Sequence, residues 1–327
     1  MSSGAEEQYL NLPDGRTLAY AHGGNFTSSE VIIFFHGVFG VGGVSRLPPA
    51  FAERDVHYIA PTLPGWGKTS PTPSSRSFHE TLYKDTAALI SHLYPQTNQL
   101  RLYISGGSFG TVAAQILYGA SYEAFPLGRQ ISGLLLIAPI SPPHVHEGFT
   151  RCLSWMNYFA LGPPAKILPF NLTQRMGIAM FRKKLDTPEH AAGFIREYAF
   201  KNLTPEEREG CEAWKTLRGF EEGQAEKEIG MSTFRSVEVT WEGFLAVPSV
   251  IHSDWGGYDP RIEDESRKAP VLVVMNREDK DHKLMGEWLV SSIKGATALY
   301  KPGGHMASLF YLDDIWAQFL RPASAAL

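Results

Sequence analysis

Residues 100–110 read LRLYISGGSFG, and this stretch decides the fold of the chain. A short apolar, β-rich run leads into the pattern Gly-x-Ser-x-Gly at 106–110, and helical spacing continues to Tyr118. In such a strand-to-helix turn, small neighbours let the backbone pack closely and leave the serine Oγ exposed. The helix N-terminus then favours developing negative charge. The pattern therefore predicts Ser108 as a nucleophile at a sharp turn.

Short apolar runs of the same kind recur along the chain and are typical of buried parallel strands. They are Val31–Phe35, Val56–Ala60, Leu100–Ile104, Ile131–Ala138, Val271–Met275 and Thr297–Tyr300. Helical spacing lies between them, at 78–93, 109–118, 282–293 and after Ala307. Residues 8–22 add a hairpin signature around Pro13-Asp14-Gly15. This alternation predicts an α/β fold with a doubly wound, mostly parallel sheet.

Residues 141–255 carry no buried-strand signal. They are rich in aromatic, methionine and charged residues, with helical spacing near Phe194–Phe200 and Glu206–Leu217. A block of this kind between two strands of one sheet predicts a helical cap over one edge of that sheet. We therefore expect a core of 1–140 and 256–327 and a cap insertion of 141–255.

The composition is that of an ordinary globular protein, with 327 residues, 43% hydrophobic residues and a net charge of −4. Without a basic excess, nucleic acid is not an expected partner. The longest apolar runs are far shorter than the roughly 20 residues that span a bilayer, so no membrane span is predicted. The acidic N-terminus does not resemble a signal peptide, and only Cys152 and Cys211 are present, which predicts a cytoplasmic protein with reduced thiols.

A serine hydroxyl is a poor nucleophile at its ordinary pKa, so a hydrolase needs a base to take its proton and an acid to orient that base. Candidates for both lie downstream. The strand predicted at 271–275 ends in Asn276–Asp281, a carboxylate-rich loop at the edge where α/β sheets bind ligands. The next predicted strand is followed by Pro302–Met306, which contains a histidine.

The chain order Ser108, Asp279, His305 is the order of nucleophile, acid and base in the α/β-hydrolase fold. Glu278 and Asp281 are the alternative acids in the same loop. With these motifs the chain resembles the α/β-hydrolase family, specifically its serine esterases and lipases with a helical cap, over nearly its whole length. The resemblance implies that Ser108 attacks, His305 moves the proton and Asp279 orients His305.

Two further segments carry the resemblance. His36–Gly40 looks like the family's His-Gly oxyanion loop, and Pro64–Ser70 looks like its Pro-Gly-x-Gly-x-Ser segment. The resemblance implies an oxyanion hole formed by the backbone N–H groups of Phe109 and of Val38 or Phe39. The side chain at 36 is expected to brace its loop through hydrogen bonds to backbone rather than to take part in the chemistry.

The chain departs from the family pattern at Asn276, where the family often has glycine. Its serine nucleophile differs from the aspartate of the epoxide-hydrolase and dehalogenase branches. Ester-like acyl chemistry is favoured for that reason.

The substrate pocket is expected where the cap meets the sheet, with Phe39, His144, His146, Trp155 and Trp241 as candidates. Two histidines without a third ligand make a weak metal site, so neither a metal nor a cofactor is predicted. Most aromatic residues of the insertion are expected in the cap core. These aromatic residues include Trp155, Tyr158, Phe159, Trp241, Phe244 and Trp255, and a minority of them are expected to line the pocket.

The sequence thus predicts a hydrolase that cleaves an ester or lactone of a moderately large apolar small molecule through an acyl-enzyme on Ser108. A C–C bond hydrolase would use the same three residues. A proline iminopeptidase-like aminopeptidase would grip a free amine with cap carboxylates such as those of Glu206–Glu209, otherwise expected as a solvated helix face. A non-catalytic ligand-binding protein of the same fold is the third alternative, and a homodimer is left open.

Overall fold

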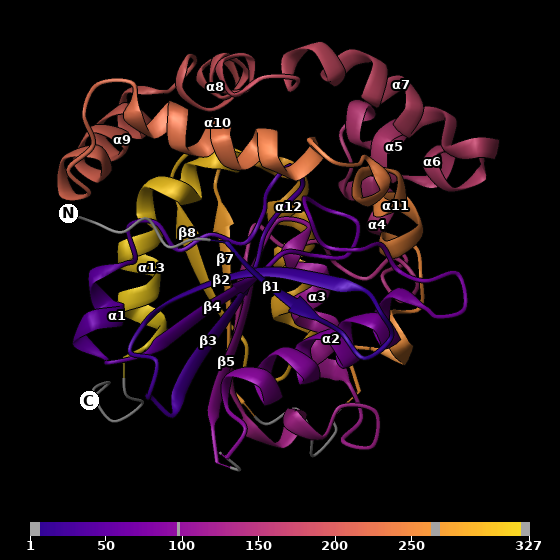
Figure 1. Cartoon of the computed structure of the whole chain (residues 1–327). Coiled ribbons are helices and arrows are strands. Elements are labelled where there is room, and N and C mark those ends of the chain that lie inside the picture. Colours follow the sequence, from indigo (N-terminus) through magenta and orange to yellow (C-terminus); the bar gives the residue numbers. More distant parts are fainter. Residues whose placement is uncertain (1–6, 97–98, 263–268, 322–327) are drawn as a thin grey trace.

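An eight-stranded sheet forms the centre of the molecule (Figure 1). The computed structural model describes residues 7–96, 99–262 and 269–321. The strand order is β1-β2-β4-β3-β5-β6-β7-β8; β2 is antiparallel to both neighbours, and the pairs from β4 to β8 are parallel. This confirms the doubly wound, mostly parallel sheet. The strands are β1 Gln8–Asn11, β2 Thr17–Gly24, β3 Glu30–Phe35, β4 His57–Pro61, β5 Arg101–Gly107, β6 Ile131–Ile137, β7 Val271–Asn276 and β8 Thr297–Lys301.

Helices cover both faces of the sheet and enclose two apolar layers. One layer includes α2 (Phe78–Leu93), α3 (Gly110–Gly119) and α12 (Lys280–Ser292). The other includes α1 (Pro49–Glu53) and α13 (Leu312–Phe319). All ten residues of α3 are buried, which fixes the N-terminus of this helix against the middle of the sheet.

Two helix starts differ from the sequence prediction for local reasons. α12 begins two residues before the predicted start, because the Asp279 carboxylate caps it and accepts the backbone N–H of His282. A 3-10 helix, His305–Tyr311, precedes α13, so the chain turns immediately after Gly304.

Between β6 and β7 the described residues form helices and no strand. Figure 1 shows α7, α8 and α10 lying across one end of the sheet, as a cap would. We propose that residues 141–255 form this cap. Its α-helices are α4 Phe149–Cys152, α5 Trp155–Leu161, α6 Pro163–Ile167, α7 Leu172–Phe181, α8 Pro188–Ile195, α9 Pro205–Leu217, α10 Gln224–Val237 and α11 Glu242–Ile251. Among the helices of the described chain, none combines the length and apolarity of a membrane span.

Candidate active site

Ser108 lies on the turn between β5 and α3 with a φ of 49°, in the left-handed region that costs a non-glycine residue energy. Its N–H donates to the Ile137 carbonyl at 2.8 Å, which ties the turn to β6. A Cβ on Gly106 would lie 2.3 Å from the Gly110 carbonyl oxygen, and one on Gly110 would lie 2.1 Å from that of Phe35. Only glycine fits at both positions, so the Gly-x-Ser-x-Gly pattern is a requirement of the backbone.

A path of hydrogen bonds runs from Ser108 through His305 to Asp279. Ser108 Oγ lies 3.1 Å from His305 Nε2, and His305 Nδ1 lies 2.7 Å from Asp279 Oδ2. The three residues follow β5, β8 and β7, whose parallel ends lie at one edge of the sheet. The imidazole is 26% exposed and the carboxylate 8%. A small molecule can therefore reach the imidazole of His305 while the carboxylate of Asp279 stays shielded.

The loop after β7 offers three carboxylates, and the structure gives each a different partner. Asp279 faces His305. Glu278 accepts the backbone N–H of Gly303. Asp281 points toward the insertion and accepts from Ser154 N–H and Oγ, both at 2.8 Å, and from Asn157 Nδ2 at 2.6 Å. Of the two alternative acids, neither contacts the imidazole.

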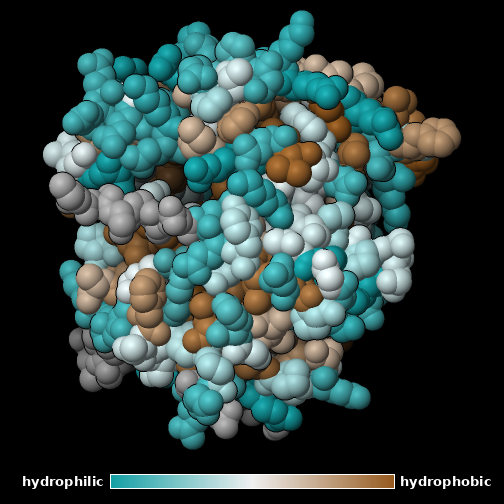
Figure 2. Space-filling model, viewed as in Figure 1, coloured by the Kyte–Doolittle hydropathy of each residue, from teal (hydrophilic) through white to brown (hydrophobic). Residues whose placement is uncertain are grey.

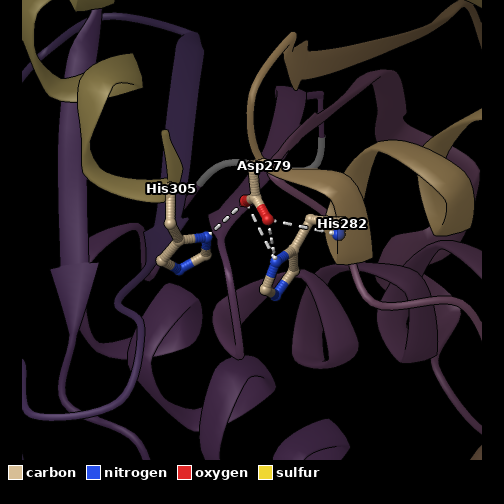
Figure 3. Close-up of side chains that lie close together, drawn as sticks. All are labelled: Asp279, His282 and His305. Atoms are coloured by element: carbon tan, nitrogen blue, oxygen red, sulfur yellow. Dashed lines mark hydrogen bonds and ion pairs between the residues drawn. The ribbon is translucent and has the colours of Figure 1, made fainter. Parts of the chain in front are cut away.

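A second histidine shares the Asp279 carboxylate. His282 Nδ1 lies 3.0 Å from Asp279 Oδ1, so one carboxylate lies between two imidazoles, as Figure 3 shows. The centroids of the His282 and His305 rings are 4.2 Å apart. One possible ligand atom from each of the three residues lies within 4.8 Å of the other two, so within the described residues these three form a group that could hold a metal ion.

Burial and the two imidazoles act in opposite directions on the acid. Burial alone would raise the pKa of Asp279, but hydrogen bonds from His282 and His305 hold it well below its usual range. Burial and the proximity of His305 lower the pKa of His282. At neutral pH, therefore, Asp279 is ionised and His282 is neutral, with Nδ1–H donating to the carboxylate.

The loop that carries His305 is held from the core and from the insertion. Buried Asn276 donates from Nδ2 to the carbonyls of Gly304 at 2.5 Å and His305 at 3.2 Å, and its Oδ1 accepts from Ser308 at 2.6 Å. Glu207, on α9, accepts the Gly304 N–H at 2.8 Å. The amide that replaces the common glycine thus fixes the backbone on both sides of the base. Glu207 is buried rather than part of a solvated face, which corrects the expectation for that residue.

The loop after β3 approaches Ser108 closely. A Cβ on Gly37 would lie 3.4 Å from that of Ser108. His36 behaves as expected, since its Nδ1 donates to the Gly37 carbonyl at 2.8 Å and its Nε2 accepts the Leu63 N–H at 2.9 Å. Within the described part of the chain, the backbone N–H groups of Val38 and Phe109 donate to no other protein group.

The five predicted pocket residues do not all lie together. The Phe39 ring lies 6.1 Å from that of Trp241, in a cluster that also holds Phe181 and Phe244. His144 bonds to the Tyr258 carbonyl at 2.9 Å. His146 bonds to Ser141 Oγ at 2.7 Å and stacks on Trp288. Trp155 is 76% exposed.

The expectation of a cap core holds for some aromatic residues of the insertion and is wrong for others. Trp255 is fully buried, and Trp241 and Phe244 are half-buried. Trp155, Tyr158 and Phe159 are exposed instead. These three share the short helix α5, in which no residue is buried.

Tyr198, on the insertion, interacts electrostatically with Asp279 and was not predicted. It lies in a π-helical turn, Arg196–Phe200, and its ring stacks on Phe194 at 5.7 Å. Burial raises the pKa of the Tyr198 phenol, and the negative charge of Asp279 raises it further. Tyr198 nevertheless exposes 59% of its surface and is open to a ligand. π-helical turns occur frequently at functional sites.

Comparison with known proteins identifies the family and the fold of the chain. Residues 32–318 match the family model described as the alpha/beta hydrolase family, and the chain belongs to that family. No curated protein matches the sequence.

The solved structures that resemble the chain share its fold. A hydrolase from Pseudomonas aeruginosa is 20% identical with a TM-score of 0.60, and the match covers 98% of this chain and 100% of that one. An esterase from Exiguobacterium antarcticum is 16% identical with a TM-score of 0.55, covering 96% and 97%. An epoxide hydrolase from Vigna radiata is 14% identical with a TM-score of 0.58, covering 98% and 97%. The α/β-hydrolase fold is thereby shown.

Proposed function

We propose that the protein is a serine hydrolase that cleaves an ester or lactone of a moderately large apolar small molecule. The observation that carries the proposal is the continuous hydrogen-bonded path from Ser108 through His305 to Asp279. Such a path activates a serine hydroxyl and holds the imidazole in the tautomer that accepts its proton.

In the acylation step, Ser108 Oγ attacks the carbonyl carbon while its proton passes to His305 Nε2. The oxyanion that forms accepts hydrogen bonds from the N–H groups of Val38 and Phe109, each such donor typically worth about 3 to 4 kcal/mol. His305 then protonates the leaving alcohol oxygen as the carbon–oxygen bond breaks. In a lactone that alcohol stays attached to the acyl group.

In the second step, water gives a proton to His305 and attacks the acyl-enzyme, and Ser108 leaves with the proton returned. Asp279 stays ionised throughout, because its pKa is depressed. The carboxylate stabilises the imidazolium that forms in both steps. His282, which donates to the same carboxylate, would hold Asp279 in the orientation that receives His305 Nδ1–H.

The preference for an apolar substrate rests on the rings beside the oxyanion loop. Phe39, which follows Val38, is half-buried and stacks on Phe244 at 5.1 Å, with Phe181 at 5.3 Å. Apolar and aromatic walls with few polar groups are typical of small-molecule sites. Bulky apolar acyl or alcohol groups would gain more from this surface than short polar ones.

A cytoplasmic location is proposed on the two thiols, since Cys152 and Cys211 are buried and not joined in a disulfide.

The proposal is tested with a panel of p-nitrophenyl esters of increasing chain length, lactones and aminoacyl anilides. Long-chain esters or bulky lactones should give the highest kcat/KM, and Ser108→Ala should abolish their hydrolysis. A preference for aminoacyl anilides with a free amine would contradict the proposal in favour of an aminopeptidase. Turnover of a vinylogous diketone without any ester hydrolysis would contradict it in favour of C–C bond cleavage.

A further inference from the structure

The segment Gly148–Leu185 has an unusual charge pattern. It contains no aspartate or glutamate, although the whole chain has 34 acidic residues and a net charge of −4. Its basic residues all have exposed side chains, and they are Arg151, Lys166, Arg175, Arg182, Lys183 and Lys184. The segment includes α5, α6 and α7 and is therefore a positively charged part of an acidic protein.

The same segment exposes large apolar side chains. Six of them are between 62% and 85% exposed: Trp155, Met156, Ile167, Phe170, Met176 and Met180. Elsewhere in the described chain, only Leu217 and Val239 reach that range. Figure 2 shows hydrophobic atoms at the upper right, where Figure 1 labels α6 and α7. We call the exposed face of Trp155–Lys184 the cap face.

The backbone presents these side chains to solvent rather than to the core. On α7, Leu172, Met176 and Met180 follow one another at intervals of four residues, so they form one exposed stripe. Phe170 has a φ of 57°, an uncommon conformation for a bulky residue, and is 85% exposed. Arg175 Nε donates to the Phe170 carbonyl at 2.8 Å and fixes this turn. A strained turn that keeps a phenylalanine in water is costly without a partner.

We propose that the cap face docks onto an anionic lipid bilayer. A helical surface with apolar side chains beside lysines and arginines binds the interface of such a bilayer through buried apolar area and attraction to the headgroups. A second copy of this chain would bring the same positive face into a symmetric contact, where like charges repel. Charge complementarity therefore favours lipid over self-association.

The cap face adjoins the candidate active site. Ser154 and Asn157, at the start of α5, bond to Asp281 in the loop of the acid. Phe181, the last residue of α7, lies 5.3 Å from Phe39 in the oxyanion loop. An apolar ester that partitions into the bilayer would thus meet the protein beside its site. This delivery step rests on the proposed function, whereas the docking itself does not.

The test is co-sedimentation of the Ser108→Ala protein with sucrose-loaded vesicles, which measures docking without turnover. Vesicles of phosphatidylcholine alone are compared with vesicles that contain about 30% phosphatidylserine. The apolar variant is Ile167→Ser/Phe170→Ser, and the charge variant is Lys183→Glu/Lys184→Glu. Their matched controls are Val239→Ser and Lys84→Glu/Lys227→Glu, which alter exposed residues outside the segment.

Binding should require phosphatidylserine and weaken as salt rises, because charge attraction is screened. Each cap-face variant should bind about tenfold more weakly or worse, with both controls unchanged and all melting temperatures preserved. Absence of binding to anionic vesicles, or unchanged binding by both cap-face variants, would overturn the proposal. A dimer in sedimentation velocity that Ile167→Ser/Phe170→Ser dissociates, without vesicle binding, would overturn it in favour of a second copy. Vesicle binding without ester hydrolysis would count against the proposed function and support the docking.

Discussion

The turn that carries Ser108 and the loops that carry Asp279 and His305 lie at the same edge of the sheet, but they are determined differently. At the serine, backbone atoms of Phe35 and Gly110 leave no room for side chains, and glycine is required. After β7, the loop offers three carboxylates, and hydrogen bonds to distant segments determine which of them faces the His305 imidazole. Local sterics specify the first region, and long-range hydrogen bonds specify the second.

The largest expected difference is among the three carboxylates of the loop after β7, whose substitution should affect kcat/KM very differently. Asp279→Asn should lower kcat/KM by about 10⁴-fold, because an amide disfavours the required tautomer of His305. Glu278→Gln and Asp281→Asn should change it by less than about tenfold, since neither side chain contacts the imidazole. Steady-state kinetics on the best ester, with melting curves to confirm folding, measures this. A larger loss for Asp281→Asn than for Asp279→Asn would reverse the assignment.

The steric side of the comparison predicts a large effect on stability. Gly106→Ala would push a methyl group to 2.3 Å from a backbone oxygen, and should reduce the free energy of unfolding by about 3 kcal/mol or more. Gly107→Ala is the matched control, because its Cβ would meet only the Phe34 ring at an ordinary 3.5 Å. Urea denaturation of both variants gives the difference. Equal stabilities would show that the turn tolerates a side chain at 106.

Lowering the pH should reduce the free energy of unfolding through His36 at pH values where Asp279 is still ionised. Burial of the ring lowers the pKa of His36 to about 4, although the hydrogen bond to the Gly37 carbonyl acts in the opposite direction. The unfolded chain, with a pKa near 6.5, therefore binds more protons below that pH, and stability falls as pH decreases.

From this residue alone the free energy of unfolding should drop by about 2 kcal/mol between pH 7 and pH 5. Burial also lowers the pKa values of His57 and His282, so both residues add to the loss of stability. Asp279, with its depressed pKa, loses its contribution only below about pH 4. Denaturation curves across this range check the sign, and His36→Gln should flatten the dependence. Rising stability toward pH 5 would be incompatible with a buried neutral ring.

The smallest expected effect concerns the second imidazole on Asp279. His282→Leu should reduce kcat/KM about tenfold, as losses of such supporting hydrogen bonds do. It should also move the acid limb of the pH–rate profile to higher pH, because a carboxylate that accepts one fewer hydrogen bond stabilises the His305 imidazolium more strongly. His282→Asn, whose amide can donate from the position of Nδ1, should restore both. If kcat/KM fell tenfold in His282→Leu but the acid limb of the pH–rate profile stayed in place and His282→Asn restored nothing, His282 would act through packing alone.

Most of the sheet could be predicted from the sequence, because buried parallel strands are short apolar runs with a recognisable period. All eight strands coincide with such runs or with the predicted hairpin. The turn that carries Ser108 was also predictable, because its steric demand for glycine at 106 and 110 leaves a local pattern in the sequence. The helical insertion was visible as a gap between strand signals.

The supporting residues of the site could not be predicted in the same way. Glu207 completes a capping-box pattern with Thr204, but its bond to Gly304 joins residues 97 positions apart. His282 stands three residues after Asp279, a spacing that would have placed both on one helical turn had the start of α12 been known. Tyr198 depends on a π-helical turn that no pattern marked. The exposure of Trp155 reverses its expected place, because side-chain hydrophobicity does not reveal which helix faces lack a neighbour.

The central claim is that Ser108 is an activated nucleophile, and active-site labelling tests it most directly. The folded protein is treated with a fluorophosphonate probe, digested and mapped by mass spectrometry, with Ser108→Ala and His305→Ala in parallel. The account predicts a single modified serine at 108, no label in Ser108→Ala and strongly slowed labelling in His305→Ala. Modification at another serine, or an unlabelled wild-type protein, would contradict it.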